Sequence, residues 1–236
     1  MAYFKDQKKL KAVTFSYDDG TTQDIRLIEL LNKYNLKSTF NLNSELLGQK
    51  GIIIRNNQRI AHYKIFPEDV RHIYSGHEVA VHTLTHPRLT ELDEKEIIRQ
   101  VSKDRENLSE LVGYDVCGMA YPCGGVNNDD RVAEIIKNNT EIRYCRTITN
   151  TDSFDPQPNL YRFNPNVCHV LEYDRMMEMG KQFVDMKCDT PKIFYIWGHS
   201  FEMDCCADYW IKLEEFFEFI SNRDDIFYGT NAEVLL

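Results

Sequence analysis

Short runs of β-branched and aromatic residues alternate along this chain with segments of helical periodicity. Residues 12–17 and 37–42 have the composition of buried strands, and the apolar residues of 24–31, between them, recur at helical spacing. Strands that are separated by helices pair in parallel, because the chain must return across the sheet before it starts the next strand. Further helices are predicted at 92–112, 129–138, 174–184 and 209–220. The alternation therefore predicts an α/β fold whose active-site residues gather at the carboxyl ends of the strands.

Two aspartates stand directly at the carboxyl end of the first predicted strand. Asp18 and Asp19 are followed by Gly20, which lets the chain turn away from the sheet. Adjacent buried carboxylates repel each other unless a cation, a hydrogen-bond donor or a proton compensates their charge. The pair therefore suggests one metal ligand beside one free base. The commoner alternative for two such residues is a solvated turn or a helix cap.

Three histidines follow later strand-like runs. The run 77–82 ends at His82, and His86 is one helical turn or one tight loop further on, so both imidazoles can point at one ion. His199 follows the run 194–198. Two histidines and one aspartate leave coordination positions open, as in catalytic rather than structural metal sites. An HxxxH pattern also arises by chance, but its occurrence with the aspartate pair and a third histidine, all at strand ends, favours a site.

Other titratable side chains receive mainly structural interpretations. Residues 43–63 are polar and are predicted to form a loop at one lip of the cleft, which makes His62 a surface residue. His169 is expected to lie outside the cleft. Glu202, three residues after His199, has two open interpretations: it hydrogen-bonds to that histidine, or its charge favours the start of a helix.

Four short segments, taken in order, resemble the motifs of a known family. They are TFSYDDG at 14–20, HTLTHP at 82–87, YPCG at 121–124 and WGH at 197–199. The family is the polysaccharide deacetylases of carbohydrate esterase family four, the NodB-homology group, and the similarity covers roughly residues 11–200. The resemblance implies a distorted (β/α) barrel with about seven parallel strands. It also implies metal-assisted hydrolysis of an N-acetyl or O-acetyl group.

The resemblance further implies roles for individual residues. The family's general base and general acid fall on Asp18 and His199, and its metal triad falls on Asp19, His82 and His86. In these roles Asp18 takes a proton from the attacking water, the metal polarises the carbonyl group, and protonated His199 gives a proton to the leaving amine. A divalent metal is therefore implied as cofactor. Zinc is the default by availability, and cobalt or nickel also suit two imidazoles and a carboxylate.

The segment YPCG at 121–124, the family's third motif, and the segment WGH at 197–199, its fifth, are implied to bind the substrate. Tyr121, Pro122 and Cys123 form the third motif, in which the backbone N–H after the proline helps to bind the oxyanion. Cys123 is smaller than the aromatic residue usual there. Trp197 stands where leucine is typical, which predicts that a large flat side chain lines the acetyl or sugar pocket.

Two family features are missing from their usual places. The arginine that orients the base is absent from the third motif, and Arg146, in the strand-like run 143–148, is the candidate replacement. The fourth motif, an aspartate and tryptophan pair that tunes the acid histidine, is not recognisable. Asp152 and Asp155 lie in the right part of the chain, and the sequence does not choose between them.

Length, charge and cysteine content favour one catalytic domain. The length of 236 residues fits one large α/β domain, and 42% hydrophobic residues can form its core. We therefore predict a single catalytic domain over residues 1–236. The net charge of −9 argues against nucleic acid or an anionic membrane as partner, and a neutral or cationic glycan is easier to reconcile. The seven cysteines lack framework spacing and are expected to stay reduced. Residues 1–9 lack an apolar signal core, so the expected location is cytoplasmic, or extracellular if a leader was removed.

Two other function classes stay open beside a deacetylase for an acetylated sugar or oligosaccharide. An amidase or cyclic imidase of the same fold would keep the metal triad but close the groove around a small amide. A non-catalytic glycan-binding relative would keep the fold without turnover. Such a module has no need for Asp18 and His199, which therefore count against it. The sequence does not indicate the oligomeric state.

Overall fold

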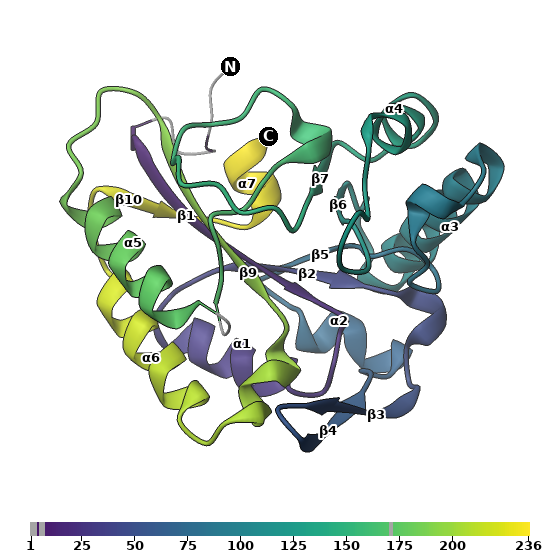
Figure 1. The fold of residues 1–236 in the computed structure, drawn as a ribbon, viewed down its shortest axis with the longest axis horizontal. Helices are drawn as coiled ribbons and strands as arrows, with labels where there is room; N and C mark the ends of the chain where they lie inside the picture. Colours follow the sequence, from purple (N-terminus) through teal and green to yellow (C-terminus); the bar gives the residue numbers. More distant parts are fainter. Residues whose placement is uncertain (1–3, 5–7, 170–171) are drawn as a thin grey trace.

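A parallel β-sheet forms the centre of the molecule (Figure 1). The computed structural model describes residues 4, 8–169 and 172–236. Within these residues the strands follow the order β7, β6, β5, β2, β1, β9, β8, and β10 also pairs with β1. The strands are β1 Lys11–Asp18, β2 Ser38–Leu42, β5 Glu78–Val81, β6 Gly118–Ala120, β7 Tyr144–Arg146, β8 Val167–Cys168, β9 Lys192–Gly198 and β10 Ile226–Tyr228. All neighbouring pairs in this sheet are parallel, as the alternation of strands and helices predicts.

The sheet curls around its central strand, β1. β9 pairs with β1 along its length, whereas β10 and β2 share the opposite edge of β1, at residues 11–13 and 15–18. At the far side, the Phe163 N–H donates to the Cys145 carbonyl oxygen at 2.9 Å, and the Thr147 N–H donates to the Phe163 carbonyl oxygen at 2.9 Å. The segment that leads into β8 therefore also contacts β7 at the other end of the sheet. The prediction of a distorted (β/α) barrel with about seven parallel strands is confirmed.

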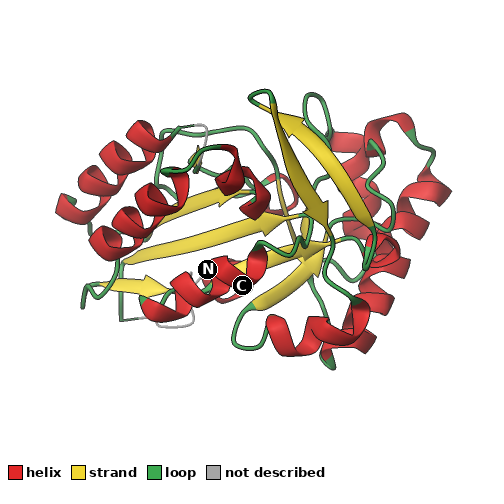
Figure 2. Ribbon diagram, turned by 90° about the horizontal axis from the view of Figure 1, so that it is seen from below, coloured by secondary structure: helices red, strands yellow, loops and turns green. Residues whose placement is uncertain are grey.

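Helices cover the outside of the curled sheet, with α5 beside α6 on one flank and α3 beside α4 on the other (Figures 1 and 2). The α-helices are α1 Asp24–Lys33, α2 Val70–Ile73, α3 Glu94–Val112, α4 Asp130–Asn139, α5 Tyr173–Asp185, α6 Tyr209–Ile220 and α7 Asn231–Leu235. The 3-10 helices are η1 Ser44–Leu46, η2 Pro67–Asp69, η3 Leu89–Glu91, η4 Leu160–Arg162 and η5 Ser200–Cys205. Asp93 caps α3 by accepting the Glu96 N–H at 2.8 Å. None of the helices in the described residues is both long and apolar enough to span a membrane.

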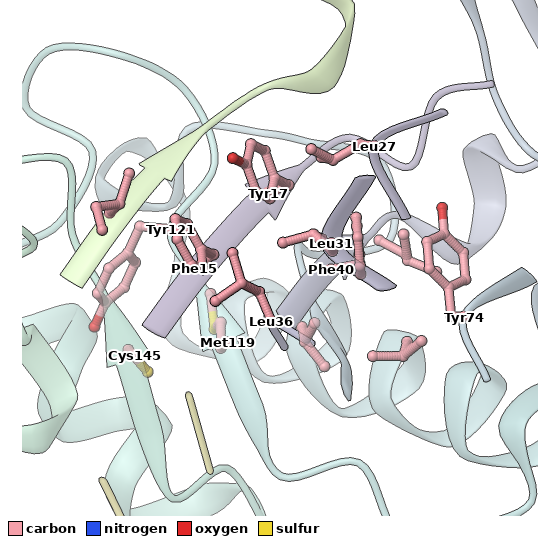
Figure 3. Close-up of a cluster of buried hydrophobic side chains, with 14 of the residues drawn as sticks. Phe15, Tyr17, Leu27, Leu31, Leu36, Phe40, Tyr74, Met119, Tyr121 and Cys145 are labelled. Atoms are coloured by element: carbon pink, nitrogen blue, oxygen red, sulfur yellow. The ribbon is translucent and has the colours of Figure 1, made fainter. Parts of the chain in front are cut away.

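Alternation along β1 separates the hydrophobic core from the candidate site. Phe15 and Tyr17 belong to the main hydrophobic cluster, where they lie near the apolar residues of β2 and α1 (Figure 3). Successive side chains of a strand point to opposite faces, so Ser16 and Asp18 point to the inside of the barrel. There both of them contact Arg146 of β7. One strand therefore supplies the core on one face and the first residue of the site on the other.

The prediction of a loop over residues 43–63 is wrong. This stretch contains an antiparallel hairpin of β3 Lys50–Arg55 and β4 Gln58–Tyr63. Asn56 and Asn57 form its turn with φ angles of 49° and 60°, the left-handed pair that a type I′ hairpin loop requires. Ile60 of this hairpin packs against Phe201 of η5. Glycine is more usual at the second turn position, and its replacement by asparagine weakens the hairpin signal in the sequence.

Candidate functional site

Asp19, His82 and His86 lie together beyond the carboxyl ends of β1 and β5. One potential ligand atom from each of these side chains lies within 4.8 Å of the others. The imidazole centroids are 4.9 Å apart, and His86 Nε2 lies 3.9 Å from Asp19 Oδ1. Because β2 pairs with both β1 and β5, two segments that are distant in the sequence end at the same edge of the sheet. The geometry thus brings together the three residues that the sequence suggests as a metal triad.

His82 is held with one ring nitrogen free. Its Nδ1 lies 2.9 Å from the Ala120 carbonyl oxygen, which can only accept, so Nδ1 carries the proton and Nε2 keeps its lone pair. Burial lowers the pKa of His82 to about 4, so the ring is neutral at neutral pH. Asn43 donates to the His82 carbonyl oxygen at 2.5 Å, and Asp104 of α3 accepts the His82 N–H at 3.2 Å. A neutral and oriented imidazole is the form in which histidine binds a metal.

Asp19 is ionised and lies between the histidines and the β3–β4 hairpin. Burial would raise the pKa of Asp19, but a hydrogen bond from His62 and the charge of Lys64 hold it well below its usual range. His62 Nε2 lies 3.2 Å from Asp19 Oδ2. Lys64 Nζ lies 3.2 Å from Asp19 Oδ1 and 2.6 Å from the Asp19 carbonyl oxygen. The interpretation of His62 as a surface residue of a loop is therefore wrong, because β4 carries its ring to the site.

Asp18 and Arg146 form a buried ion pair. Arg146 is fully buried, and its Nη2 donates to the two carboxylate oxygens of Asp18 at 2.6 and 2.5 Å. Asn41 Nδ2 donates to Asp18 Oδ1 at 2.8 Å, and Arg146 Nε donates to Ser16 Oγ at 3.2 Å. Burial would raise the pKa of Asp18, but the Arg146 guanidinium outweighs burial and lowers it. The third motif lacks an arginine, and Arg146 of β7 lies against Asp18 instead.

Several non-glycine residues around the triad have a left-handed backbone. The φ angles are 82° for Asp19, 68° for Thr83, 60° for His86 and 69° for Cys123. This region is unfavourable for residues with a Cβ atom, and such residues gather at functional sites where the surrounding contacts enforce the conformation. One such contact is the hydrogen bond from Asn43 Nδ2 to the Thr83 carbonyl oxygen at 2.9 Å. The backbone of the site is therefore preformed.

Of Tyr121, Pro122 and Cys123, only Cys123 is partly exposed. Tyr121 and Pro122 are buried, and the Tyr121 phenol donates to the Tyr161 carbonyl oxygen at 2.8 Å, within the cluster of Figure 3. The side chains of Tyr121 and Pro122 therefore pack in the core, and the prediction that these two residues bind the substrate stays a prediction. The Cys123 N–H lies 3.5 Å from His86 Nε2, and its Sγ lies 3.7 Å from His86 Nδ1. The backbone donor of Cys123 thus faces the triad.

His199 follows β9 and has a carboxylate partner. Its Nδ1 lies 3.3 Å from Oε2 of Glu202, in the first turn of η5. Burial would lower the pKa of His199, but the carboxylates of Glu202, Asp19 and Asp18 raise it to about 9. Both interpretations of Glu202 therefore keep support: it lies within ion-pair distance of the histidine, without an aligned hydrogen bond, and it stands in the first turn of a helix.

Neither aspartate considered for the fourth motif contacts His199 in the described structure. Asp152 pairs with Arg175 at 2.6 Å, and Asp155 pairs with Lys192, and both carboxylates are largely exposed. Glu202 occupies the position beside the histidine instead. A residue in the turn after the fifth motif therefore stands where the family's fourth motif would be expected to act.

Trp197 covers the buried arginine and adjoins His199. The Arg146 guanidinium carbon lies 4.6 Å from the Trp197 ring, and that ring lies 5.8 Å from the His199 ring. The next residue must be small, because a Cβ at Gly198 would come within 2.2 Å of His169. His169 is buried, and its Nδ1 lies 3.0 Å from the Tyr17 hydroxyl. His169 therefore packs against the strand and has no place in the triad.

Comparison with known proteins assigns the family. A sequence profile described as polysaccharide deacetylase matches residues 5–140, more than half of the 236 residues. The chain belongs to the polysaccharide deacetylase family. Peptidoglycan-N-acetylglucosamine deacetylase PgdA of Listeria monocytogenes is 27% identical over 132 residues, which are 55% of this chain and 24% of that protein. Chitin deacetylase 1 of Cryptococcus neoformans is 30% identical over 122 residues, 51% of this chain and 22% of that protein. The matches thus span about a quarter of the length of these relatives.

Solved structures share the fold. A protein from Mycobacterium smegmatis assigned to the polysaccharide deacetylases has a TM-score of 0.67 at 17% identity, over 96% of this chain and 89% of that chain. A family 4 carbohydrate esterase from Streptomyces lividans, in complex with acetate, has a TM-score of 0.56 at 14% identity, over 90% of this chain and 88% of that chain. A pseudoenzyme of the same family from Bacillus anthracis has a TM-score of 0.53 at 18% identity, over 96% of this chain and 66% of that chain. Since esterase and pseudoenzyme share this fold, activity must be argued from the residues of the site.

Proposed function

We propose that this member of the polysaccharide deacetylase family is a metal-dependent hydrolase that removes acetyl groups from an N-acetylated or O-acetylated carbohydrate. The observation that carries the proposal is the Asp18–Arg146 pair directly beside the open cluster of Asp19, His82 and His86. A carboxylate that a buried arginine keeps ionised and oriented is suited to act as a general base. A module that only binds glycans has no use for such a base.

The cluster of Asp19, His82 and His86 suits a divalent metal ion. Two imidazoles and a carboxylate are ligands of zinc, cobalt and nickel, and a three-residue set leaves coordination positions open. His82 keeps its Nε2 lone pair available because Nδ1 donates to Ala120. A bound ion would polarise the substrate carbonyl group and lower the pKa of water in the site. We propose zinc as the ion, on grounds of availability.

Asp18 accepts the proton of the attacking water in this proposal. The hydrogen bonds from Arg146 and Asn41 fix the plane of its carboxylate, and an ionised carboxylate has more lone pairs than these donors occupy. The Cys123 N–H, which faces the triad, is placed to stabilise the oxyanion that forms at the carbonyl group. His199 delivers a proton to the leaving amine, and Glu202 keeps the imidazole protonated beforehand.

The substrate class is proposed from the relatives. PgdA is named for the N-acetylglucosamine of peptidoglycan, and chitin deacetylase 1 is named for chitin. An acetylated sugar or oligosaccharide is the class that these names share. Trp197 offers this chain an aromatic face beside His199, a surface on which the apolar face of a sugar or an acetyl group packs.

Acetate release tests the proposed function. Metal-free protein is assayed with chitin oligomers, peptidoglycan fragments and acetylated xylan, before and after zinc is added. We expect release after zinc addition, loss of release in His82→Ala, and a zinc ion roughly 2.0–2.2 Å from Asp19, His82 and His86 in a crystal. His72→Ala is the matched control, because His72 is exposed on α2.

Hydrolysis of small amides or cyclic imides without acetate release would instead show an amidase or imidase. Zinc binding without any turnover would show a non-catalytic relative.

The role of His199 predicts a pH dependence. The acid must be protonated when the amine leaves, and the raised pKa of His199, about 9, keeps it protonated through neutral pH. We therefore expect kcat/KM on an acetamide to fall above about pH 9. Glu202→Gln should move this fall to lower pH, since burial then acts on the His199 pKa with less opposition. An unchanged profile in Glu202→Gln would contradict the role of the pair.

The leaving group separates proton donation from other roles of His199. An acetate ester of an activated phenol needs little proton donation, so His199→Ala should lose much less rate on this ester than on an acetamide. Equal losses on both substrates would show that His199 positions the substrate or stabilises the oxyanion.

A further inference from the structure

We infer that His62 of the β3–β4 hairpin is a positioning residue that aligns Asp19 for metal binding. This inference rests on the proposed metal site and extends it to a residue outside all the motifs that resemble the family. It concerns the affinity of the site for the metal, which is measurable without any substrate.

The two oxygens of the Asp19 carboxylate have different surroundings. Oδ1 lies 3.9 Å from His86 Nε2 of the triad and 3.2 Å from Lys64 Nζ. Oδ2 is the oxygen near the hairpin, 3.2 Å from His62 Nε2. A half-turn of the carboxylate only exchanges two equivalent oxygens, but a smaller rotation about its Cβ–Cγ bond would break the contact with His62. A hydrogen bond to one oxygen therefore fixes the plane of the carboxylate, so that the other oxygen faces the histidines.

The direction of this hydrogen bond follows from the ion pair of Asp19 with Lys64, at 3.2 Å between Oδ1 and Nζ. A carboxylate in an ion pair only accepts hydrogen bonds, so His62 Nε2 carries the proton and donates it. Lys64, the residue after β4, supports Asp19 as well, since its Nζ donates to the Asp19 carbonyl oxygen at 2.6 Å. This contact holds the left-handed backbone of Asp19, with a φ angle of 82°.

The His62 ring is itself held in place. The His62 and Phe201 rings meet edge to face, with their centroids 4.9 Å apart. The hairpin end is joined to the turn after β1 by backbone hydrogen bonds on either side of Lys64. The Thr22 N–H donates to the Tyr63 carbonyl oxygen at 2.8 Å, and the Ile65 N–H donates to the Gly20 carbonyl oxygen at 2.9 Å. A donor on a fixed element beside a ligand is the arrangement by which outer residues orient metal ligands.

Zinc affinity of purified variants, measured by competition with a chromophoric chelator, tests the inference. His62→Phe keeps an aromatic ring against Phe201 but has no donor, and we expect it to bind zinc about 10–100-fold more weakly than the wild type. His62→Gln places an amide N–H near the position of Nε2, and its affinity should stay close to that of the wild type. His72→Phe, at an exposed histidine of α2, is the matched control and should bind as the wild type does.

The variants distinguish positioning from packing. Thermal unfolding of the metal-free proteins shows whether each variant is folded. Wild-type affinity in folded His62→Phe would overturn the inference. A loss of zinc affinity of about 10-fold or more in folded His62→Gln, relative to the wild type, would also overturn it, and this comparison does not require His62→Phe to fold. If the wild type itself binds no zinc, the proposed metal site fails, which is a different result from a failure confined to the His62 variants.

Discussion

Replacing Asp18 by Asn should lower kcat/KM for an acetylated sugar by about 10²–10⁴-fold, the usual contribution of a general base, while zinc affinity stays close to that of the wild type. Asn keeps an oxygen that accepts hydrogen bonds from Arg146 and Asn41, but it cannot take up a proton. Asp19→Asn is the matched control, because it changes the neighbouring carboxylate. This second variant should lose zinc affinity.

The two aspartates are thereby assigned separately. Activity is measured by acetate release at saturating zinc, and affinity by chelator competition, so each variant gives two independent values. Loss of zinc from Asp18→Asn with retention in Asp19→Asn would mean that the base and the ligand have been exchanged. Full activity in zinc-loaded Asp18→Asn would rule out Asp18 as the base.

The residues at the strand ends could be predicted from the sequence because strand and turn signals lie next to each other there. Residues 12–17 are apolar and β-branched, so the following Asp18 and Asp19 must lie at the carboxyl end of a buried strand. The same argument places His82 after β5 and His199 after β9. Parallel pairing then brings these ends to one edge of the sheet, and local patterns are enough to predict a cluster.

The contacts of His62 and Lys64 could not be predicted in the same way. His62 lies in the hairpin and Lys64 directly follows it, and the Asn56–Asn57 turn of this hairpin is a weak sequence signal. The hairpin packs against the barrel through Ile60 and Phe201, which are far apart in the sequence. A single histidine in a polar stretch has the same local pattern whether it ends at the surface or beside a carboxylate. Such contacts are decided by how two elements pack.

Buried polar supports of the site were also missed. Asn41 and Asn43 donate to Asp18 and to the backbone after β5, and Asp104 on α3 accepts the His82 N–H. Burial raises the pKa of Asp104 to about 7, a mark of a carboxyl group in the interior. In the sequence Asp104 is one charged residue among many on an amphipathic helix. Only the packing of α3 against the sheet separates it from the exposed ones.

Arg146→Met should destabilise the protein by about 3–5 kcal/mol near neutral pH, because it leaves the Asp18 carboxylate buried without its partner. Arg146→Lys keeps the positive charge and gives up the planar fork that bonds to Asp18 and Ser16 together, so its loss should be smaller. Asp18→Asn combined with Arg146→Met removes the unpaired charge. We therefore expect this double variant to be more stable than Arg146→Met alone.

The pH dependence of unfolding provides the sharper test of this pair. In the wild type the pKa of Asp18 is lowered, so its ionised form stabilises the fold above the ordinary carboxyl range, and this contribution disappears as the pH falls through the lowered value. Without Arg146, burial is left to raise the pKa of Asp18 above its ordinary value, so the folded protein takes up a proton more readily than the unfolded chain. The difference in unfolding free energy between wild type and Arg146→Met should then be largest near neutral pH and should shrink on acidification. The acidic fall of kcat/KM should also move to higher pH, because a base with a raised pKa is protonated sooner. Urea unfolding at several pH values measures the first effect, and a difference that stays constant with pH would show that Arg146 contributes packing and not charge compensation.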